Sequence, residues 1–427
     1  MKLKYIVSII FLLSIFINAQ EQSNSAVKKF LGEAVYYNDF LSYRSDRPGF
    51  TRLDVFIQVP YKSIQFIKSP EGFTGKYSVT TSIFDSSKSR IVVEKTWNES
   101  ITIADFSLAT SRENFNVTKR SFELKPGYYS IRTAFEDFDS KKLTTAENNI
   151  LVKDLSAPIS LSDVLMIKPD PNQAQNTIVP NIIRNIYSSK ERVRFYFEVY
   201  STDSIEVNKS FEYIVKNADG KVIHKEQEDR IIKPGINQVL QTLKEFPFDL
   251  GAYYLTISIL DENQKTIASV LKSFYSQSKG LASFITDIDK AIAQTVYIAS
   301  SSELSYMKDD DSQSEKTKRF LEFWKKKDPS PNNEENEVFN EYFRRVAYSN
   351  ENFSNYIEGW KTDRGMVFII LGAPNNIDRH PFEYDSKPYE IWEYYDLNRS
   401  FIFLDQTGFG DYRLITPLTG DLYRYRY

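Results

Sequence analysis

The sequence of 427 residues has no cysteine and only two histidines, His224 and His380. Without cysteine, the chain has no disulfide, no thiolate metal site, no cysteine nucleophile and no lipid-modified cysteine of a lipoprotein. The histidines do not form the His-x-x-x-His or His-Glu-x-x-His spacing of a zinc site. A Gly-x-Ser-x-Gly nucleophile turn and a phosphate-binding glycine loop are also missing. We therefore expect no cofactor, no metal and no catalytic residues.

An excess of one charge is missing too, since 54 Lys and Arg stand against 57 Asp and Glu, for a formal net charge of −3. This balance excludes the basic surface of a nucleic-acid-binding protein. Glycine (15) and proline (16) are few, whereas there are 28 tyrosines and 31 phenylalanines. That composition favours extensive β-sheet joined by ordered loops. Most of the aromatic side chains are expected in cores and cross-strand pairs, with a carbohydrate-stacking surface as the alternative.

Long hydrophobic runs are absent except at the start, where Lys2 and Lys4 precede the apolar residues 5–17 and a polar run follows from Gln20. This pattern predicts a secretory signal peptide over residues 1–19. A membrane-spanning helix needs about 20 apolar residues, so an uncleaved anchor is only the alternative. A chain of this length can bury enough apolar surface without disulfides, as bacterial envelope proteins do. We expect a periplasmic or released protein with no transmembrane segment after cleavage.

Strand patterns fill the next part of the chain and recur in the same order. Apolar and polar residues alternate, and turn residues separate the runs, over residues 51–67, 77–84, 91–97, 128–135, 194–200, 211–215 and 222–225. Aligning Tyr128 and Tyr129 with Tyr253 and Tyr254 places an acidic pair after each strand, which suggests a duplicated module. The sequence thus predicts two tandem antiparallel β-sandwiches of immunoglobulin-like architecture, 27–157 and 158–275.

After Phe274 the hydrophobic period changes to that of helices. Apolar residues at helical spacing predict three helices, with the faces Leu281, Ile285, Ile288, Ile292 and Val296, then Phe320, Phe323 and Trp324, then Val338, Tyr342, Phe343, Val346 and Ala347. Strand patterns return at residues 390–395, 400–405 and 412–416. We expect a carboxy-terminal α+β domain, 276–427, with helices packed on one face of a small antiparallel sheet.

This last domain carries the most specific motif in the chain. Gly359, Trp360, Lys361, Thr362 and Asp363 are followed by Arg364 and Gly365, and then by an apolar run, Gly372 and Pro374. The segment resembles the GWxTD domain family over roughly residues 276–417, including Arg344 and Arg345 upstream. The resemblance implies an exported bacterial protein and a β-rich segment before the domain. It implies no activity for these residues.

Physical chemistry suggests a structural role for the signature. Gly359 is expected to end a helix in a left-handed conformation, and Trp360 to cover the helices. Thr362 and Asp363 are expected to accept hydrogen bonds from amides just ahead, and Gly365 to permit a bend. The apolar residues 366–371 predict a central strand covered on both faces.

Three functions remain open from the sequence. The leading hypothesis is a non-enzymatic envelope protein whose sandwiches present the last domain to a partner, another envelope protein. The second is a glycan- or peptide-binding protein with an aromatic groove, for which Trp97, Tyr384, Tyr389 and Trp392 are the candidate rings. The third is a hydrolase using Asp363 and His380 with Arg364 as an anion clamp. The candidate binding residues are Arg364, His380, Glu383 and Trp392.

Overall fold

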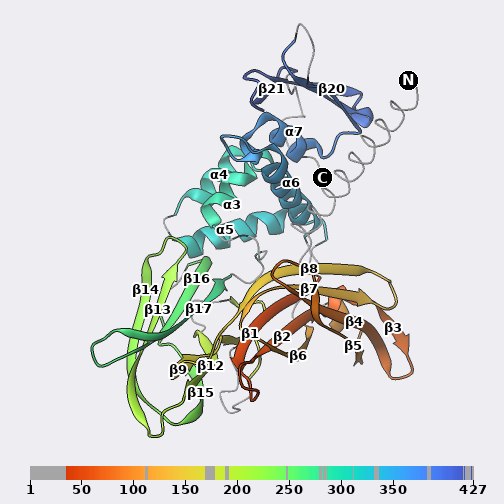
Figure 1. The fold of residues 1–427 in the computed structure, drawn as a ribbon. Helices are drawn as coiled ribbons and strands as arrows, with labels where there is room; N and C mark the ends of the chain where they lie inside the picture. Colours follow the sequence, from red (N-terminus) through yellow and green to blue (C-terminus); the bar gives the residue numbers. More distant parts are fainter. Residues whose placement is uncertain are drawn as a thin grey trace, which may run out of the picture. The chain divides into compact units, whose positions relative to one another are not determined.

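The computed structural model describes residues 35–110, 114–168, 178–187, 192–246, 249–277, 281, 285, 287–310, 312–330, 336–381, 386–416, 418 and 425. The protein is mainly β, with 49% of the described residues in strands and 20% in helices. It divides into two compact units, a β unit (Ala34–Thr286) and a carboxy-terminal unit (Asp287–Tyr427). In Figure 1 the strands from β1 to β17 belong to the first unit, and the helices from α3 onwards with the last four strands belong to the second.

The first half of the β unit consists of two antiparallel sheets packed face to face. One sheet has the order β1-β2-β6 and the other β3-β4-β7-β8, with β5 paired to β4. The bounds are β1 Tyr37–Arg44, β2 Thr51–Pro60, β3 Phe66–Ser69, β4 Gly72–Asp85, β5 Ile91–Ile103, β6 Phe115–Leu124, β7 Gly127–Asp137 and β8 Leu143–Val152, with short helical turns at η1 Tyr61–Ser63 and α2 Ser107–Thr110. Alternate residues of the facing strands, such as Val55, Ile57, Tyr77 and Phe135, form the core between the sheets. We call this half the first module.

The second half repeats this plan. Its sheets have the orders β10-β12-β15, with β9 paired to β12, and β11-β17-β16-β13-β14. The bounds are β9 Ile159–Leu161, β10 Leu165–Ile167, β11 Asn185–Ile186, β12 Arg194–Ser201, β13 Val207–Asn217, β14 Val222–Ile232, β15 Gly235–Thr242, β16 Gly251–Leu260 and β17 Thr266–Ser276. The core between them includes Phe195, Phe197, Phe211, Tyr213 and Phe274. This second module is also antiparallel, apart from the parallel pair β11 and β17.

The two modules share one strand order. The path β5-β4-β7-β8 corresponds to β14-β13-β16-β17, so the hairpins fall in equivalent places. The alignment of Tyr128 and Tyr129 with Tyr253 and Tyr254, however, is shifted by one residue. The hydroxyls of Tyr129 and Tyr253 donate to carbonyls four residues upstream, at 2.9 and 3.1 Å, whereas the side chain of Tyr128 is 71% exposed. Tyr129 therefore matches Tyr253, since each closes the turn before its strand.

Within the β unit the modules are joined by a buried interface. The Lys272 ammonium in β17 donates to both carboxylate oxygens of Asp39 in β1, at 2.8 and 2.6 Å, and both side chains are less than 10% exposed. Burial lowers the pKa of Lys272, and Asp39 partly opposes that effect. An apolar cluster surrounds the joint, with Leu41, Tyr43, Phe56, Leu165 and Ile182. The two modules therefore form one packed body.

The carboxy-terminal unit begins with helices. Their bounds are α3 Ile288–Gln294, η2 Thr295–Tyr297, α4 Ser301–Lys308, α5 Gln313–Lys326, α6 Glu337–Phe353, η3 Gly359–Lys361 and α7 Asp363–Leu371. The predicted helices at α5 and α6 are confirmed. The first predicted helix is confirmed at α3, which continues into the turn η2, and residues 282–284 and 286 lie outside the described residues. Ser300 and Glu303 form a capping box at the start of α4, a helix separate from α3. Among the described residues, no helix is long and apolar enough to cross a membrane.

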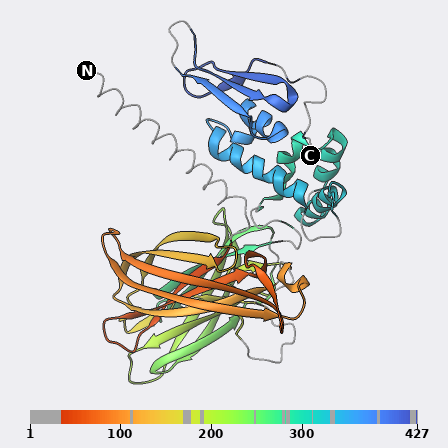
Figure 2. The same cartoon turned by 90° about the vertical axis from the view of Figure 1, so that its right-hand side faces the viewer.

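A four-stranded antiparallel meander completes this unit. Its strands are β18 Asn376–His380, β19 Tyr389–Tyr394, β20 Arg399–Asp405 and β21 Tyr412–Leu414, with η4 Tyr395–Leu397 between β19 and β20. The core of the unit joins Phe353, Val367 and Phe368 of the helices to Trp392 and Phe403 of the sheet. Figure 2 shows the sheet (dark blue) lying against the helices on one face. The predicted meander over β19 to β21 is confirmed.

The prediction of a central strand at residues 366–371 is wrong, because these residues form the body of α7. Thr362 caps that helix, and a continuously apolar run is also compatible with a helix buried on all sides. The fourth strand of the sheet is instead β18, which carries His380. The sequence patterns predicted no strand at these residues.

Candidate functional site

The signature residues meet where α6 ends and α7 begins, and we call residues 359–365 with their neighbours the signature corner. Its two glycines permit unusually close backbone contacts. A Cβ atom on Gly359 would lie 1.8 Å from the carbonyl oxygen of Ser349, and one on Gly365 would lie 1.9 Å from the carbonyl oxygen of Gly359. Gly359 starts the 3₁₀ turn η3 and is not among the residues with positive φ, so the predicted left-handed helix end is wrong. Gly365 lies in the first turn of α7 and permits packing, not a bend into a strand.

Trp360 covers this corner, as predicted from the sequence. Its side chain is 7% exposed, and the indole N–H donates to Glu358 Oε2 at 3.1 Å. The backbone is also held, because Trp360 N–H donates to Asn350 Oδ1 at 3.0 Å and the Tyr297 hydroxyl donates to Trp360 O at 2.8 Å. The backbone of Trp360 thus ties α6, η2 and η3 together.

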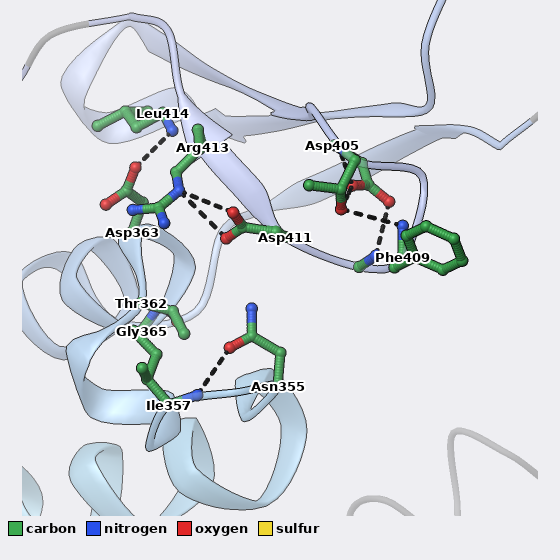
Figure 3. Close-up of polar contacts among 12 residues, drawn as sticks. Asn355, Ile357, Thr362, Asp363, Gly365, Asp405, Phe409, Asp411, Arg413 and Leu414 are labelled. Carbon is green, nitrogen blue, oxygen red and sulfur yellow. Dashed lines mark hydrogen bonds and ion pairs between the residues drawn. The ribbon is translucent and has the colours of Figure 1, made fainter.

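Thr362 and Asp363 have different partners. Thr362 Oγ1 accepts from Gly365 N–H at 3.0 Å and donates to Gly359 O at 2.8 Å, which makes it the N-cap of α7. Asp363 Oδ2 accepts from Leu414 N–H at 2.8 Å, and Figure 3 shows this bond between α7 and β21. The prediction of a local amide partner is therefore confirmed for Thr362 and wrong for Asp363.

The other end of α7 is held by Gly372 and Arg345. Gly372 has a φ of 83°, and Pro374 follows two residues later. The Arg345 guanidinium in α6 donates to the carbonyls of Ile369 and Ile370 at 3.1 and 3.3 Å. These are carbonyls of the last turn of α7, which have no partner within the helix, so Arg345 caps it from a neighbouring element.

The signature corner also contains an acid with a strongly shifted pKa. A hydrogen bond from Lys290 lowers the pKa of Glu358 to about 2, and bonds from Lys361 and Trp360 add to that effect against the opposing effect of burial. Because the pKa of Glu358 lies below its usual value near 4.5, the associated stability is present above pH 4.5. It is lost as the pH falls from about 4.5 to about 2.

We therefore expect acid to destabilise the carboxy-terminal unit more in the native chain than in Glu358→Gln. The side chain of Glu358 is 37% exposed, so solvent screening limits the difference in unfolding free energy to about 1 kcal/mol. Denaturant titrations of both chains at pH 7 and pH 3 measure it. An identical acid response of the two chains would contradict the assignment.

Arg364 points away from the signature turn, toward the sheet. Its guanidinium lies over the rings of Tyr412 and Phe353, at 4.1 and 5.3 Å from their centres, and Nη1 lies 3.5 Å from Glu390 Oε1. Glu390 also accepts from the indole N–H of Trp392 at 3.0 Å. Arg364 thus shares a partner with Trp392, another candidate binding residue.

The remaining candidates lie elsewhere in this unit. His380 Nε2 lies 3.0 Å from Asp378 Oδ2, and its ring stacks on Tyr389 at 4.3 Å. Glu383 lies outside the described residues. Asp363, Arg364 and His380 therefore form hydrogen bonds to three different residues, Leu414, Glu390 and Asp378.

Among the rings considered for an aromatic groove, those that the structure describes do not form a shared exposed surface. Trp392 is 1% exposed and Trp97 is 8% exposed, so both belong to cores. Tyr389 is half-buried against His380, and Tyr384 lies outside the described residues. Among the described residues, no three His, Asp or Glu side chains gather in a way that could hold a metal ion.

One feature that the sequence analysis missed is the loop between β20 and β21. The Asp405 carboxylate accepts from the backbone N–H groups of Gly408 and Gly410 at 2.9 and 2.7 Å, and from that of Thr407 at 3.2 Å. Figure 3 shows Asp405 and Phe409 in this loop. Burial alone would raise the pKa of Asp405, but these bonds outweigh it and lower the pKa. At the tip, the Phe409 side chain is 79% exposed. The signal in the sequence was the Asp-x-x-Gly-x-Gly spacing after a strand.

Solved structures offer little guidance. The chain is 12% identical to red sea bream transglutaminase, with a TM-score of 0.19 over 60% of this chain and 33% of that one. It is 8% identical to Bacteroides uniformis β-glucuronidase, with a TM-score of 0.22 over 52% of this chain and 26% of that one. The chain spans a third or less of the length of these structures, and such low scores carry no argument about its fold or activity. No curated protein matches the chain.

A family model does match, over residues 251–409. The match starts at the first residue of β16, earlier than the expected start at residue 276, and it contains all of the signature corner. It ends at Phe409, the tip of the Asp405 loop. The protein is therefore one that contains a GWxTD domain.

Proposed function

We propose that the protein is an exported component of the cell envelope, without catalytic activity, whose GWxTD domain binds another protein. The signal-like residues 1–19 and the absence of cysteine support export to the periplasm or beyond as a protein that is not lipid-anchored. Thr362, Asp363 and the backbone of Trp360 are engaged in caps and cross-links, which supports a structural role for these residues of the motif. In this proposal the β unit carries the domain and contributes no chemistry.

The β unit suits such a role if its modules are immunoglobulin-like. Support comes from the paired sheets with equivalent strand orders and from the two tyrosine hydroxyls that close the turns before β7 and β16. A tyrosine that bonds back to the backbone at this position is a feature of immunoglobulin-like sandwiches. The buried pair of Asp39 and Lys272 would hold the two modules in a fixed arrangement.

The observation that carries the proposal is the exposed ring of Phe409 on an ordered loop. Three backbone amides of the loop are bound to Asp405, and Lys387 Nζ donates to Gln406 O at 2.7 Å. The loop is therefore held in one conformation before any partner arrives. A large apolar ring on a preorganised loop costs little entropy to bury, and such rings are frequent anchors of protein interfaces.

A second loop of the same unit has a similar construction. Asn355 N–H donates to Ile357 O, and Ile357 N–H donates to Asn355 Oδ1, both at 3.1 Å (Figure 3). Between them, Tyr356 is 82% exposed. Two fixed loops with exposed aromatic side chains favour a protein partner over a small molecule, which would need a concave pocket.

A photo-crosslinking amino acid at position 409 is expected to capture one discrete partner in native envelopes. The same substitution at Tyr128, an exposed tyrosine of the first module, is the matched control and should not capture it. The captured protein, once identified and purified, should bind the full chain, and Phe409→Ala should weaken that binding at least about tenfold. Isothermal titration calorimetry measures the change.

Phe409→Ala should leave the unfolding midpoint unchanged, because the ring is exposed. Equal capture from positions 409 and 128, or equal affinity of native chain and variant, would reject Phe409 as an anchor. If crosslinking captures no protein in native envelopes and the purified chain binds none, the proposed function itself is rejected.

A further inference from the structure

Two arginines of the GWxTD domain converge on one buried carboxylate. Glu390 in β19 has a side chain that is 9% exposed, and its Oε1 lies 3.5 Å from Arg364 Nη1 and 3.4 Å from Arg379 Nε. Arg379 stands directly opposite Glu390 in the antiparallel pair β18 and β19. Glu390 Oε2 is occupied by the indole N–H of Trp392 at 3.0 Å. The carboxylate is therefore held in place by groups from α7, β18 and β19.

The arginines are much less satisfied than the carboxylate. A guanidinium offers five N–H donors, and a well-formed pair with a carboxylate uses two of them at about 2.7–2.9 Å. Among the described residues, Arg364 and Arg379 each donate one hydrogen bond, and both bonds are long, at 3.5 and 3.4 Å. Most donors of the two guanidinium groups thus remain available at this cluster.

The surroundings hold Arg364 in place and leave Arg379 accessible. Arg364 is stacked between Tyr412 and Phe353, and its side chain is only 15% exposed. The Arg379 side chain is 63% exposed. Arg364 is therefore fixed by stacking while Arg379 faces solvent, so a group entering from solvent could contact both guanidinium groups.

We propose that Arg364 and Arg379 form a binding site for a carboxylate of a partner polypeptide. One incoming carboxylate completes a cluster of two guanidinium groups and two carboxylates, which is neutral. A phosphate dianion beside Glu390 would leave an excess negative charge. The nearby Asp405 carboxylate is engaged by its own loop amides, so it does not neutralise the arginines by hydrogen bonding.

This inference rests on the proposed function, and it adds the chemistry that the protein partner must have. Tyr412, under Arg364, lies three residues after Phe409 on the same hairpin. The partner would place an acidic group at the arginines and an apolar pocket at Phe409. The acidic group is either an Asp or Glu side chain or a chain-terminal carboxylate.

Small probes test the site without the partner. N-acetylglutamic acid α-amide carries only a side-chain carboxylate, N-acetylglutamine carries only an α-carboxylate, and N-acetylglutamine amide is neutral. In NMR titrations of the full chain, at least one acidic probe should shift the Nε–Hε signals of Arg364 and Arg379 in a saturable way. The acidic probe that binds more tightly identifies the source of the carboxylate.

Matched variants locate the effect. Arg379→Gln should weaken probe binding about tenfold, because it removes one charged donor group. Arg413→Gln, which removes an exposed arginine of β21 paired with Asp411, should leave it unchanged. Glu390→Gln should strengthen binding, since it removes the like charge beside the incoming carboxylate.

The inference is overturned if the neutral probe shifts the same signals, if Arg379→Gln and Arg413→Gln behave alike, or if inorganic phosphate binds more tightly than either acidic probe. Because the titration contains no partner, its failure is distinct from a failure to capture a protein at Phe409.

Discussion

Gly359→Ala is expected to lower the unfolding free energy of the carboxy-terminal unit by at least about 3 kcal/mol. The added methyl group would lie 1.8 Å from Ser349 O and 2.8 Å from Asn350 Cα. Both are backbone atoms of α6, so no side chain can rotate away, and the helix itself must move. Denaturant unfolding followed by tryptophan fluorescence measures the effect, because Trp324, Trp360 and Trp392 lie in this unit.

Gly408→Ala is the matched control for this prediction. Gly408 has a φ of 75°, but nothing lies within 4 Å of its Cβ position. Alanine there should cost only the strain of a left-handed residue, about 1–2 kcal/mol. Equal losses at the two positions would show that crowding at the signature corner is not what requires Gly359.

Lys272→Ala is expected to destabilise the β unit by about 3–5 kcal/mol, because it leaves the Asp39 carboxylate buried without its partner. The two side chains are 8% and 9% exposed, so water cannot replace the lost ammonium. Thermal unfolding followed by circular dichroism in the β-sheet region measures the loss. Lys225→Ala is the control, since Lys225 is 53% exposed in its pair with Glu212 and should contribute less than about 1 kcal/mol.

The double variant Asp39→Asn with Lys272→Met separates charge burial from packing. Removing both charges should restore most of the stability, because the cost of the single variant is an unpaired charge. If the double variant is as unstable as Lys272→Ala, the joint between the modules depends on the shape of the lysine side chain and not on its charge.

Strand periodicity proved informative about the β modules. Alternating apolar residues such as Val55 and Ile57 predicted strands, and turn residues placed the hairpins between them, because both signals act within a few residues. The same local signals misplaced the alignment of the repeat by one residue. Which of two adjacent tyrosines closes a turn depends on a hydroxyl bond that periodicity does not reveal.

The run 366–371 marks the limit of pattern reading in the GWxTD domain. A continuous apolar stretch fits a buried strand and a buried helix equally well. The helix forms because Thr362 caps its start, and Arg345 caps its end from α6. Thr362 is a common N-cap residue and stands next to its helix in the sequence. The cap from Arg345 depends on the packing of α6 against α7, which the sequence pattern does not reveal.

Hydrophobic periodicity, turn residues and the signature motif were enough to predict the β-rich modules, the helices α5 and α6, and the meander. Each of these depends on residues close together in the sequence. Long-range contacts determined the rest. Asp363 meets Leu414 across 51 positions, Lys272 meets Asp39 across 233, and Arg364 meets Arg379 only through Glu390. These pairings arise when packed elements remove water from charged and polar groups, which then take whichever partner the fold brings within reach.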